Sequence, residues 1–223
     1  MRKNCRFIRT LLFTIVYIGI SMILTGCSAT ELEERCFPML VAVGYEDGKI
    51  SYGAVFPKDD AAGQSGSKES EIQVPEVTDV NFALSKEKYE KRLNKEVDYN
   101  HMKVLVFEDE IFDKSGMYDE VIDSLTRSEA FPRNTYVCVA DDVEDLFEIQ
   151  KSISQDLGSY LEEYIQKQEK DKEQLLTLGD LIDEKANQTN MLYLPYLDIE
   201  ENYIEWKGYM NTNGKIWKES HIE

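Results

Sequence analysis

Two strand-like segments separated by a helical segment limit the possible folds of this chain more than any other feature. Residues 103–107 form a compact apolar strand pattern, and residues 134–140 have the strongest β-propensity in the sequence. Between them, apolar residues from Tyr118 to Leu125 recur at helical spacing after Ser115, a candidate helix N-cap. A crossover of this length normally makes its two strands parallel neighbours in one sheet. The run therefore predicts an α/β fold.

Hairpin signals lie on both sides of this central run. Asp47-Gly48 separates a buried strand pattern over 36–44 from a partly alternating one over 49–55. Asn213-Gly214 lies between aromatic-rich strand patterns near the C-terminus. Further helical patterns cover residues 81–94, 143–149, 153–170 and 177–187. We therefore expect a mixed β-sheet with flanking helices and a β-hairpin near each end.

A polar, Gly/Ser-rich stretch interrupts the strand patterns at about residues 57–78. Such a composition does not pack into a core, so we expect a mobile loop here and not a domain boundary. With 42% hydrophobic residues the chain can bury a substantial core. The sequence predicts a single α/β domain over residues 36–223.

The N-terminus has the pattern of a bacterial lipoprotein signal peptide. Basic residues are followed by an apolar stretch that is short for a membrane-spanning helix and that ends at a processing site. The residues of this lipobox are Leu24, Thr25, Gly26 and Cys27. We expect a signal peptide over 1–26, a lipid on the thiol of Cys27 and a short tether over 27–35. The alternative is an uncleaved single-pass anchor, and both place the remaining chain on the outer side of a membrane.

The chain is strongly acidic. Loss of the four positive charges of residues 1–26 would change its formal net charge from −18 to −22. A nucleic-acid partner is therefore not expected, because a phosphate-binding surface needs clustered Lys and Arg. Anionic lipid head groups would also repel the domain, so that the lipid must hold it at the membrane. An acidic surface keeps an exported domain soluble.

Cys5 would be removed with the signal peptide and Cys27 would carry the lipid, which leaves two of the four cysteines to consider. Cys36 and Cys138 both fall in apolar, strand-like surroundings. A disulfide between them and two buried free thiols are both compatible with this pattern. The sequence has no CxxC pair and no Cys/His cluster with metal-ligand spacing. We therefore expect neither a metal site nor a cofactor.

Acidic residues follow two of the predicted strands. Glu108, Asp109 and Glu110 lie directly after a strand, at the edge where open α/β sheets bind ligands. They could form a cation site or an acid/base pair, although a solvated loop entering a helix is the favoured interpretation. Asp141 and Asp142 are typical of a helix N-terminus. Because no nucleotide-binding, hydrolase or metalloprotease motif occurs, we expect no catalytic residues and no enzyme.

Several short segments occur in a characteristic order over most of residues 24–217. They are 24–27, 34–35 before 37–45, 101–108, 127–134 before 136–140, 194–195, and 207–210 with 213–215. In order and spacing they resemble the N-terminal domain of the Ger(x)C spore-germination lipoproteins, the C subunits of GerA-type germinant receptors. That family usually continues into a long C-terminal region, whereas this sequence ends at Glu223.

The resemblance implies a non-enzymatic, lipid-anchored subunit that takes part in nutrient-triggered spore germination. It would lie on the outer face of the cell membrane or spore inner membrane, with two integral membrane subunits of the A and B type. Arg127 and Arg133 are candidate partner contacts, because they flank a predicted loop between a helix and a strand. Trp206 and Tyr209 are further candidates, although they also fit cross-strand pairs of the C-terminal hairpin.

Two other functions remain open on the sequence. One is an extracytoplasmic lipoprotein that binds a small molecule or peptide. Its pocket would lie at the carboxyl edge of the strands ending at Phe107 and Ala140. The other is an extracytoplasmic hydrolase that uses Glu108 or Asp109.

Overall fold

The computed structural model describes Thr14 and residues 34–57, 76–114, 116–153, 155–168, 175–187, 191–200 and 203–217. The chain divides into two units, Met1–Glu34 and Arg35–Glu223, and all elements named below belong to the second. Apart from Thr14, the predicted signal peptide lies outside the described residues, as does Cys27. Within the described ranges, no helix combines the length and apolar character that crossing a membrane requires.

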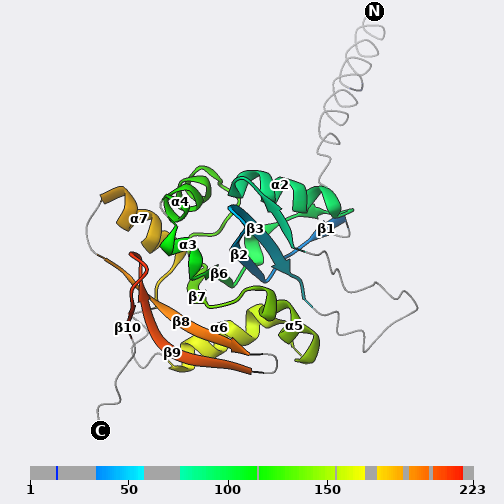
Figure 1. Ribbon diagram of the computed structural model, residues 1–223. Coiled ribbons are helices and arrows are strands. Elements are labelled where there is room, and N and C mark those ends of the chain that lie inside the picture. Colours follow the sequence, from blue (N-terminus) through cyan, green and yellow to red (C-terminus); the bar gives the residue numbers. More distant parts are fainter. Residues whose placement is uncertain are drawn as a thin grey trace, which may run out of the picture. The chain divides into compact units, whose positions relative to one another are not determined.

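An eight-stranded mixed sheet forms the centre of the second unit (Figure 1). In spatial order its strands are β10 (Ile216–Trp217), β9 (Tyr203–Asn211), β8 (Tyr193–Glu200), β7 (Tyr136–Ala140), β6 (Val104–Glu108), β2 (Leu40–Glu46), β3 (Lys49–Val55) and β4 (Val77–Asp79). The four central strands β2, β6, β7 and β8 run parallel, and the outer pairs are antiparallel. The predicted α/β fold and the parallel pairing of β6 with β7 are confirmed.

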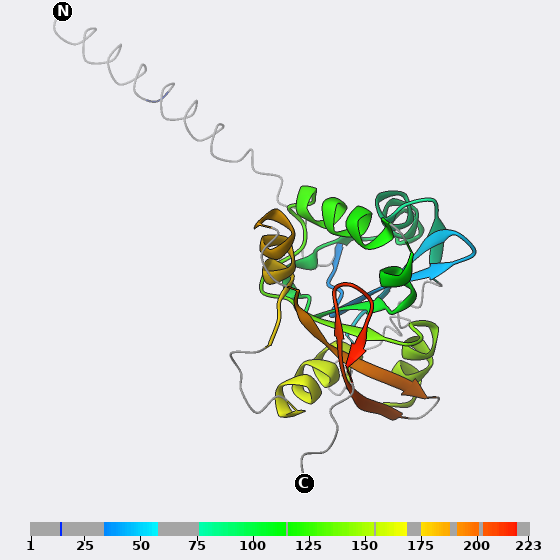
Figure 2. The same cartoon turned by 60° about the vertical axis from the view of Figure 1, so that its left-hand side comes forward.

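Helices cover both faces of this sheet (Figures 1 and 2). One face carries α2 (Phe82–Arg92), α4 (Met117–Arg127) and α7 (Leu178–Asn187), and the other carries α5 (Glu144–Ser152) and α6 (Leu157–Gln168). Strand residues alternate between the two cores, so that Val41 faces the first and Ala42 the second. Covered on both faces, β6 and β7 are almost wholly apolar, as is typical of buried parallel strands.

The remaining elements are short. A two-stranded parallel pair joins β1 (Arg35–Cys36) to β5 (Glu96–Val97). One 3₁₀ turn, η2 (Tyr99–His101), precedes β6, and one short helix, α3 (Glu110–Asp113), follows it.

Both predicted hairpin turns are present. Asp47 and Gly48 have φ angles of 48° and 83°, and they join β2 to β3 in full antiparallel register. Positive φ at both central residues matches the right-handed twist of the two strands. Gly214, with φ 78°, turns the chain between β9 and β10. Asp47, Gly48 and Gly214 therefore act here through their tolerance of left-handed backbone.

Two local predictions need comment, the extent of the polar loop and the N-cap before α4. The first was partly wrong, and the second concerns a residue outside the described part of the chain. The predicted loop over 57–78 is too long, because Val77–Asp79 forms β4 at the sheet edge, with Val77 buried and paired with Tyr52. Residues 58–75 are outside the described part of the chain. Ser115 also lies outside it, and the residue preceding α4 is Gly116, whose φ is 80°.

The two remaining cysteines are free thiols, both buried. Cys36 belongs to the core that includes α2, whereas Cys138 belongs to the core that includes α5 and α6. The sheet therefore separates the two side chains. The structure contains two free thiols here and not a disulfide. Burial raises the pKa of both.

Candidate functional site

A pocket of about 590 Å³ lies between β3 and α5, beside the carboxyl ends of β2 and β6. This volume is within the range of small-molecule sites. Glu108 and Asp142, which follow Phe107 and Ala140 in the chain, contribute to the lining. The pocket thus lies beside the sheet edge at which the sequence predicts ligand binding.

Two glycines shape the wall of this pocket. A Cβ atom on Gly44 would lie 2.5 Å from Ser51 Oγ and 2.8 Å from Glu108 Oε2. A Cβ on Gly53 would overlap the ring of Phe147 from α5. The absence of both side chains therefore allows a carboxylate and an aromatic ring to lie directly against the sheet backbone.

The lining is predominantly acidic. Its carboxylates are Glu46, Glu76, Glu108, Asp142, Glu144 and Glu148. Lys151 also lines the pocket, and its Nζ lies 2.5 Å from Glu148 Oε1. Apolar walls come from Val55, Phe56, Val143 and Phe147. The pocket therefore combines a strongly negative lining with several apolar side chains.

Glu108 has the most perturbed carboxyl group of the pocket. Partial burial raises its pKa to about 7, and the negative charges of Asp142, Glu76 and Glu110 add to this rise. The Tyr45 backbone N–H, which donates to Glu108 Oε2 at 2.6 Å, acts in the opposite direction. Glu108 thus changes its charge near neutral pH.

Glu76 and Gln150 each keep one buried polar atom without a hydrogen-bond partner among the described residues. For Glu76 this atom is Oε1, and burial raises the pKa of its carboxyl group while Ser51 partly offsets that rise. Gln150 is 9% exposed; its Oε1 accepts from the Leu157 N–H at 2.7 Å, and its Nε2 lacks a partner. Native proteins contain few such groups, so two in one pocket require an explanation.

The sequence prediction included neither Glu76 nor Gln150. Gln150 shares the buried face of α5 with Leu146 and Ile149. A glutamine at a position where the helical pattern calls for an apolar residue could have identified it as a candidate site residue. Glu76 gave no such signal, because it follows the polar stretch and reaches the pocket only when β4 pairs with β3.

The structure separates the side chains of the acidic run that begins at the last residue of β6. Glu108 lines the pocket, whereas Asp109 Oδ2 accepts from the Tyr196 hydroxyl at 2.9 Å. Glu110 lies 3.6 Å from Lys114 in an exposed ion pair. Within the described part of the chain, no group of three or more His, Cys, Asp or Glu residues is arranged to hold a metal ion. Glu108 and Asp109 therefore do not act as a pair in one site.

The two acids after β7 also have different roles. Asp142 Oδ1 accepts from the Glu144 N–H at 2.8 Å at the start of α5, as predicted for a helix N-terminus. Asp141 Oδ1 instead accepts from Ile199 on β8 at 2.8 Å, so its predicted helix-capping role is wrong. Burial and neighbouring Asp198 raise the pKa of Asp141 to about 6.

The four candidate partner residues lie in three separate parts of the chain. Arg127, the exposed last residue of α4, donates to Ser124 Oγ at 3.4 Å. Arg133 pairs with Asp183 on α7 at 2.7 Å. Trp206 and Tyr209 of β9 form an edge-to-face pair with ring centroids 5.4 Å apart. Tyr209 also lies opposite Trp217 of β10 in the register of the C-terminal hairpin, as the cross-strand interpretation predicts, whereas Trp206 lies opposite Leu197 of β8.

Replacing Arg133 with alanine should lower the free energy of unfolding by less than about 1 kcal/mol, because its ion pair with Asp183 is solvent-exposed. Chemical denaturation at low and high salt would measure this change, with Arg127→Ala as the matched control. A larger loss would show that Arg133 holds α7 on the sheet, and it would weaken its candidacy as a partner contact.

Comparisons with known proteins give one family and one solved structure. The crystal structure of the GerBC protein has a TM-score of 0.37 and 13% sequence identity with this chain, and the alignment covers 78% of this chain and 49% of that one. The chain thus spans about half the length of that protein. No curated protein matches in sequence. The family described as spore germination protein N-terminal domain matches residues 28–199, and the chain therefore belongs to that family, as its resemblance to the Ger(x)C proteins predicts.

Proposed function

We propose that this chain is a lipid-anchored, non-catalytic subunit of a spore germinant-receptor-like complex. The observation that carries this proposal is the family match over residues 28–199. The match begins at the residue after Cys27, where the lipobox predicts cleavage and lipid attachment. The family and the N-terminal sequence therefore support the same division of the chain into an exported domain and an anchor.

The lipid would act by concentrating the domain at the membrane surface. A domain with a formal charge of −22 after processing is repelled by anionic head groups, so acyl chains on Cys27 must supply the attachment. Attachment raises the effective concentration of the domain beside integral membrane subunits of the A and B type. Weak contacts are then sufficient for assembly on the outer face of the cell membrane or spore inner membrane.

The contacts with these subunits would involve Arg127, Arg133 and the aromatic surface of β9. Trp206 and Tyr209 are partly exposed, and Tyr203 on the same strand is 50% exposed. Aromatic residues and arginine are enriched at protein interfaces, which supports this choice.

Replacing Cys27 with alanine should reduce co-purification of the two integral membrane subunits about tenfold or more, because the effective concentration is lost. The measurement is mild cross-linking in native membranes, followed by affinity capture of the tagged full-length chain. Cys5→Ala is the matched control, since Cys5 would be removed with the signal peptide.

Two results would contradict this proposal, the first its subunit role and the second its lipid anchor. One is recovery of a well-expressed, lipidated chain without any multi-pass partner. The other is equal recovery of partners by the wild type and the Cys27→Ala variant, which would exclude the lipid as the cause of assembly.

A second candidate function is that of an extracytoplasmic lipoprotein that binds a small molecule. The observation that favours it is the pocket between β3 and α5, with its unpartnered Glu76 and Gln150 atoms. The two functions are compatible, because a receptor subunit can also bind a ligand.

A further inference from the structure

We propose that the pocket between β3 and α5 binds a small organic cation. The ligand would carry a primary ammonium group, a hydroxyl or carbonyl oxygen, and an apolar body. This inference deepens the second candidate function by naming the ligand class, and it does not require assembly of a receptor complex.

The charge of the lining selects a cation. Six carboxylates line the pocket, and Lys151 beside them is paired with Glu148. A concave site lined by one sign of charge concentrates ligands of the opposite sign. An anionic ligand, or a zwitterion whose carboxylate enters the pocket, would be repelled by the same groups.

The unpartnered polar atoms define the rest of the ligand. Gln150 is more than nine-tenths buried, and the bond from Leu157 N–H to its Oε1 orients the carboxamide, which leaves Nε2 as a donor. Glu76 Oε1 is a buried acceptor. Both residues line the pocket, so a ligand that supplies an acceptor to Gln150 and a donor to Glu76 would complete their hydrogen bonding; a hydroxyl or carbonyl group and an ammonium group provide these.

The apolar walls distinguish an organic cation from a bare metal ion. Val55, Phe56 and Phe147 line the same pocket and would cover the apolar body of a ligand. The described residues contain no cluster of three or more potential metal ligands in suitable positions. Charge, hydrogen-bonding capacity and apolar surface therefore point to the same ligand class.

The first test is titration calorimetry of the detergent-solubilised full-length protein with L-phenylalaninol, which combines the three groups. We expect saturable binding at millimolar concentrations or below. N-acetyl-L-phenylalaninol lacks the charge and should not bind, and L-phenylalanine, which carries a carboxylate, should bind more weakly. Absence of saturable binding of L-phenylalaninol, or equal binding of its acetylated form, would overturn the proposal.

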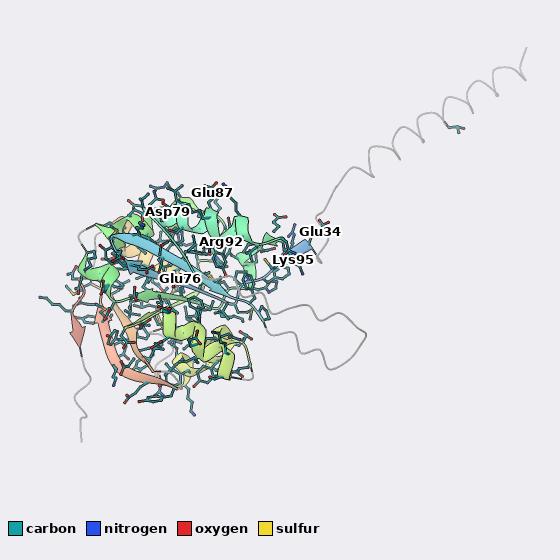
Figure 3. All side chains as sticks on the ribbon, turned by 45° about the vertical axis from the view of Figure 1, so that its right-hand side comes forward. Glu34, Glu76, Asp79, Glu87, Arg92 and Lys95 are labelled. Atoms are coloured by element: carbon teal, nitrogen blue, oxygen red, sulfur yellow. The ribbon has the colours of Figure 1, made fainter. Side chains whose placement is uncertain are left out.

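The second test uses two charge-matched variants. Glu76→Gln should weaken binding of L-phenylalaninol about tenfold or more, because it removes a charge-assisted hydrogen bond. Glu87→Gln removes the same charge from the exposed surface of α2 and should leave affinity unchanged; Figure 3 labels both residues. Circular dichroism would confirm that both variants are folded. Equal affinity of Glu76→Gln and the wild type would exclude Glu76 as the ammonium partner and overturn the proposed site.

The ligand test and the capture test fail separately. A protein that captures its membrane partners but does not bind L-phenylalaninol contradicts only the inferred ligand class. One that binds this compound but captures no partner contradicts only the receptor subunit.

Discussion

Replacing Gly158 with alanine should destabilise the domain by about 2 kcal/mol, although alanine is the better helix former. Gly158 is the second residue of α6, so the change to alanine gains at most the propensity difference of about 1 kcal/mol found in helix interiors. Overpacking of a close contact costs up to about 3 kcal/mol. At this site a Cβ atom would lie 2.5 Å from the Met39 carbonyl oxygen and 2.6 Å from its carbon. The clash therefore outweighs the gain in propensity.

The backbone of Met39 cannot easily move away from this clash. Its carbonyl oxygen accepts from the Lys103 N–H at 2.8 Å, and its own N–H donates to Val55 O at 2.8 Å. Helix α6 must shift instead, and this disturbs the packing of Leu157 and Leu161, which are both fully buried. Where α6 contacts the start of β2, the backbone of Met39 is thus held in place by its hydrogen bonds to the neighbouring residues Val55 and Lys103.

Urea denaturation of the full-length protein would measure the loss from the shift in midpoint. Ser159→Ala, the next position of α6, is the matched control and should change stability by less than about 0.5 kcal/mol. A Gly158→Ala protein as stable as the wild type would show that α6 does not lie against Met39.

Replacing Glu108 with glutamine should stabilise the domain by about 1–2 kcal/mol near pH 8 and have little effect near pH 4. The pKa of Glu108 is raised from 4.5 to about 7, so the folded protein retains this proton in a pH range where the unfolded chain loses it. Stability therefore falls as pH rises from about 4.5 to about 7, and it levels off above that range. Solvent screening at this partly exposed carboxylate keeps the effect below the full linkage value.

Glutamine removes this titration but keeps an oxygen that can accept from Tyr45 N–H. Denaturant midpoints measured from acidic to mildly alkaline pH should thus show a shallower decline in the variant. Some decline should remain, because burial also raises the pKa values of Glu76 and Asp141. Glu148→Gln at the exposed edge of the pocket is the charge-matched control. Parallel pH profiles of the wild type and Glu108→Gln would contradict the proposed ionisation of Glu108.

The fold was largely predictable because its signals are local. Apolar runs marked the strands that became β6 and β7, and the crossover between them required a parallel pair. Asp47-Gly48 and Asn213-Gly214 predicted the turns correctly, because their backbone tolerance is a property of the residues themselves. The short strand β4 was missed because a three-residue edge strand has too few residues to show an alternating pattern.

The candidate site was only partly predictable. Glu108 could be identified from its position after a strand, at the sheet edge where α/β proteins bind ligands. Gln150 and Glu76 enter the same pocket through helix packing and edge-strand pairing, which no local pattern specifies. The free state of Cys36 and Cys138 was likewise undecided until the sheet was seen to lie between them.

The sequence by itself therefore determined the α/β class, the order of the central elements, the two hairpin turns and the family resemblance. Only the tertiary structure decided that Glu76, Glu108 and Gln150 line one pocket and that Gly158 lies against Met39. The physical reason is that turn chemistry and hydrophobic periodicity act over a few neighbouring residues. Burial, charge coupling and close packing instead depend on residues far apart in the chain, which meet only when the sheet and its helices assemble.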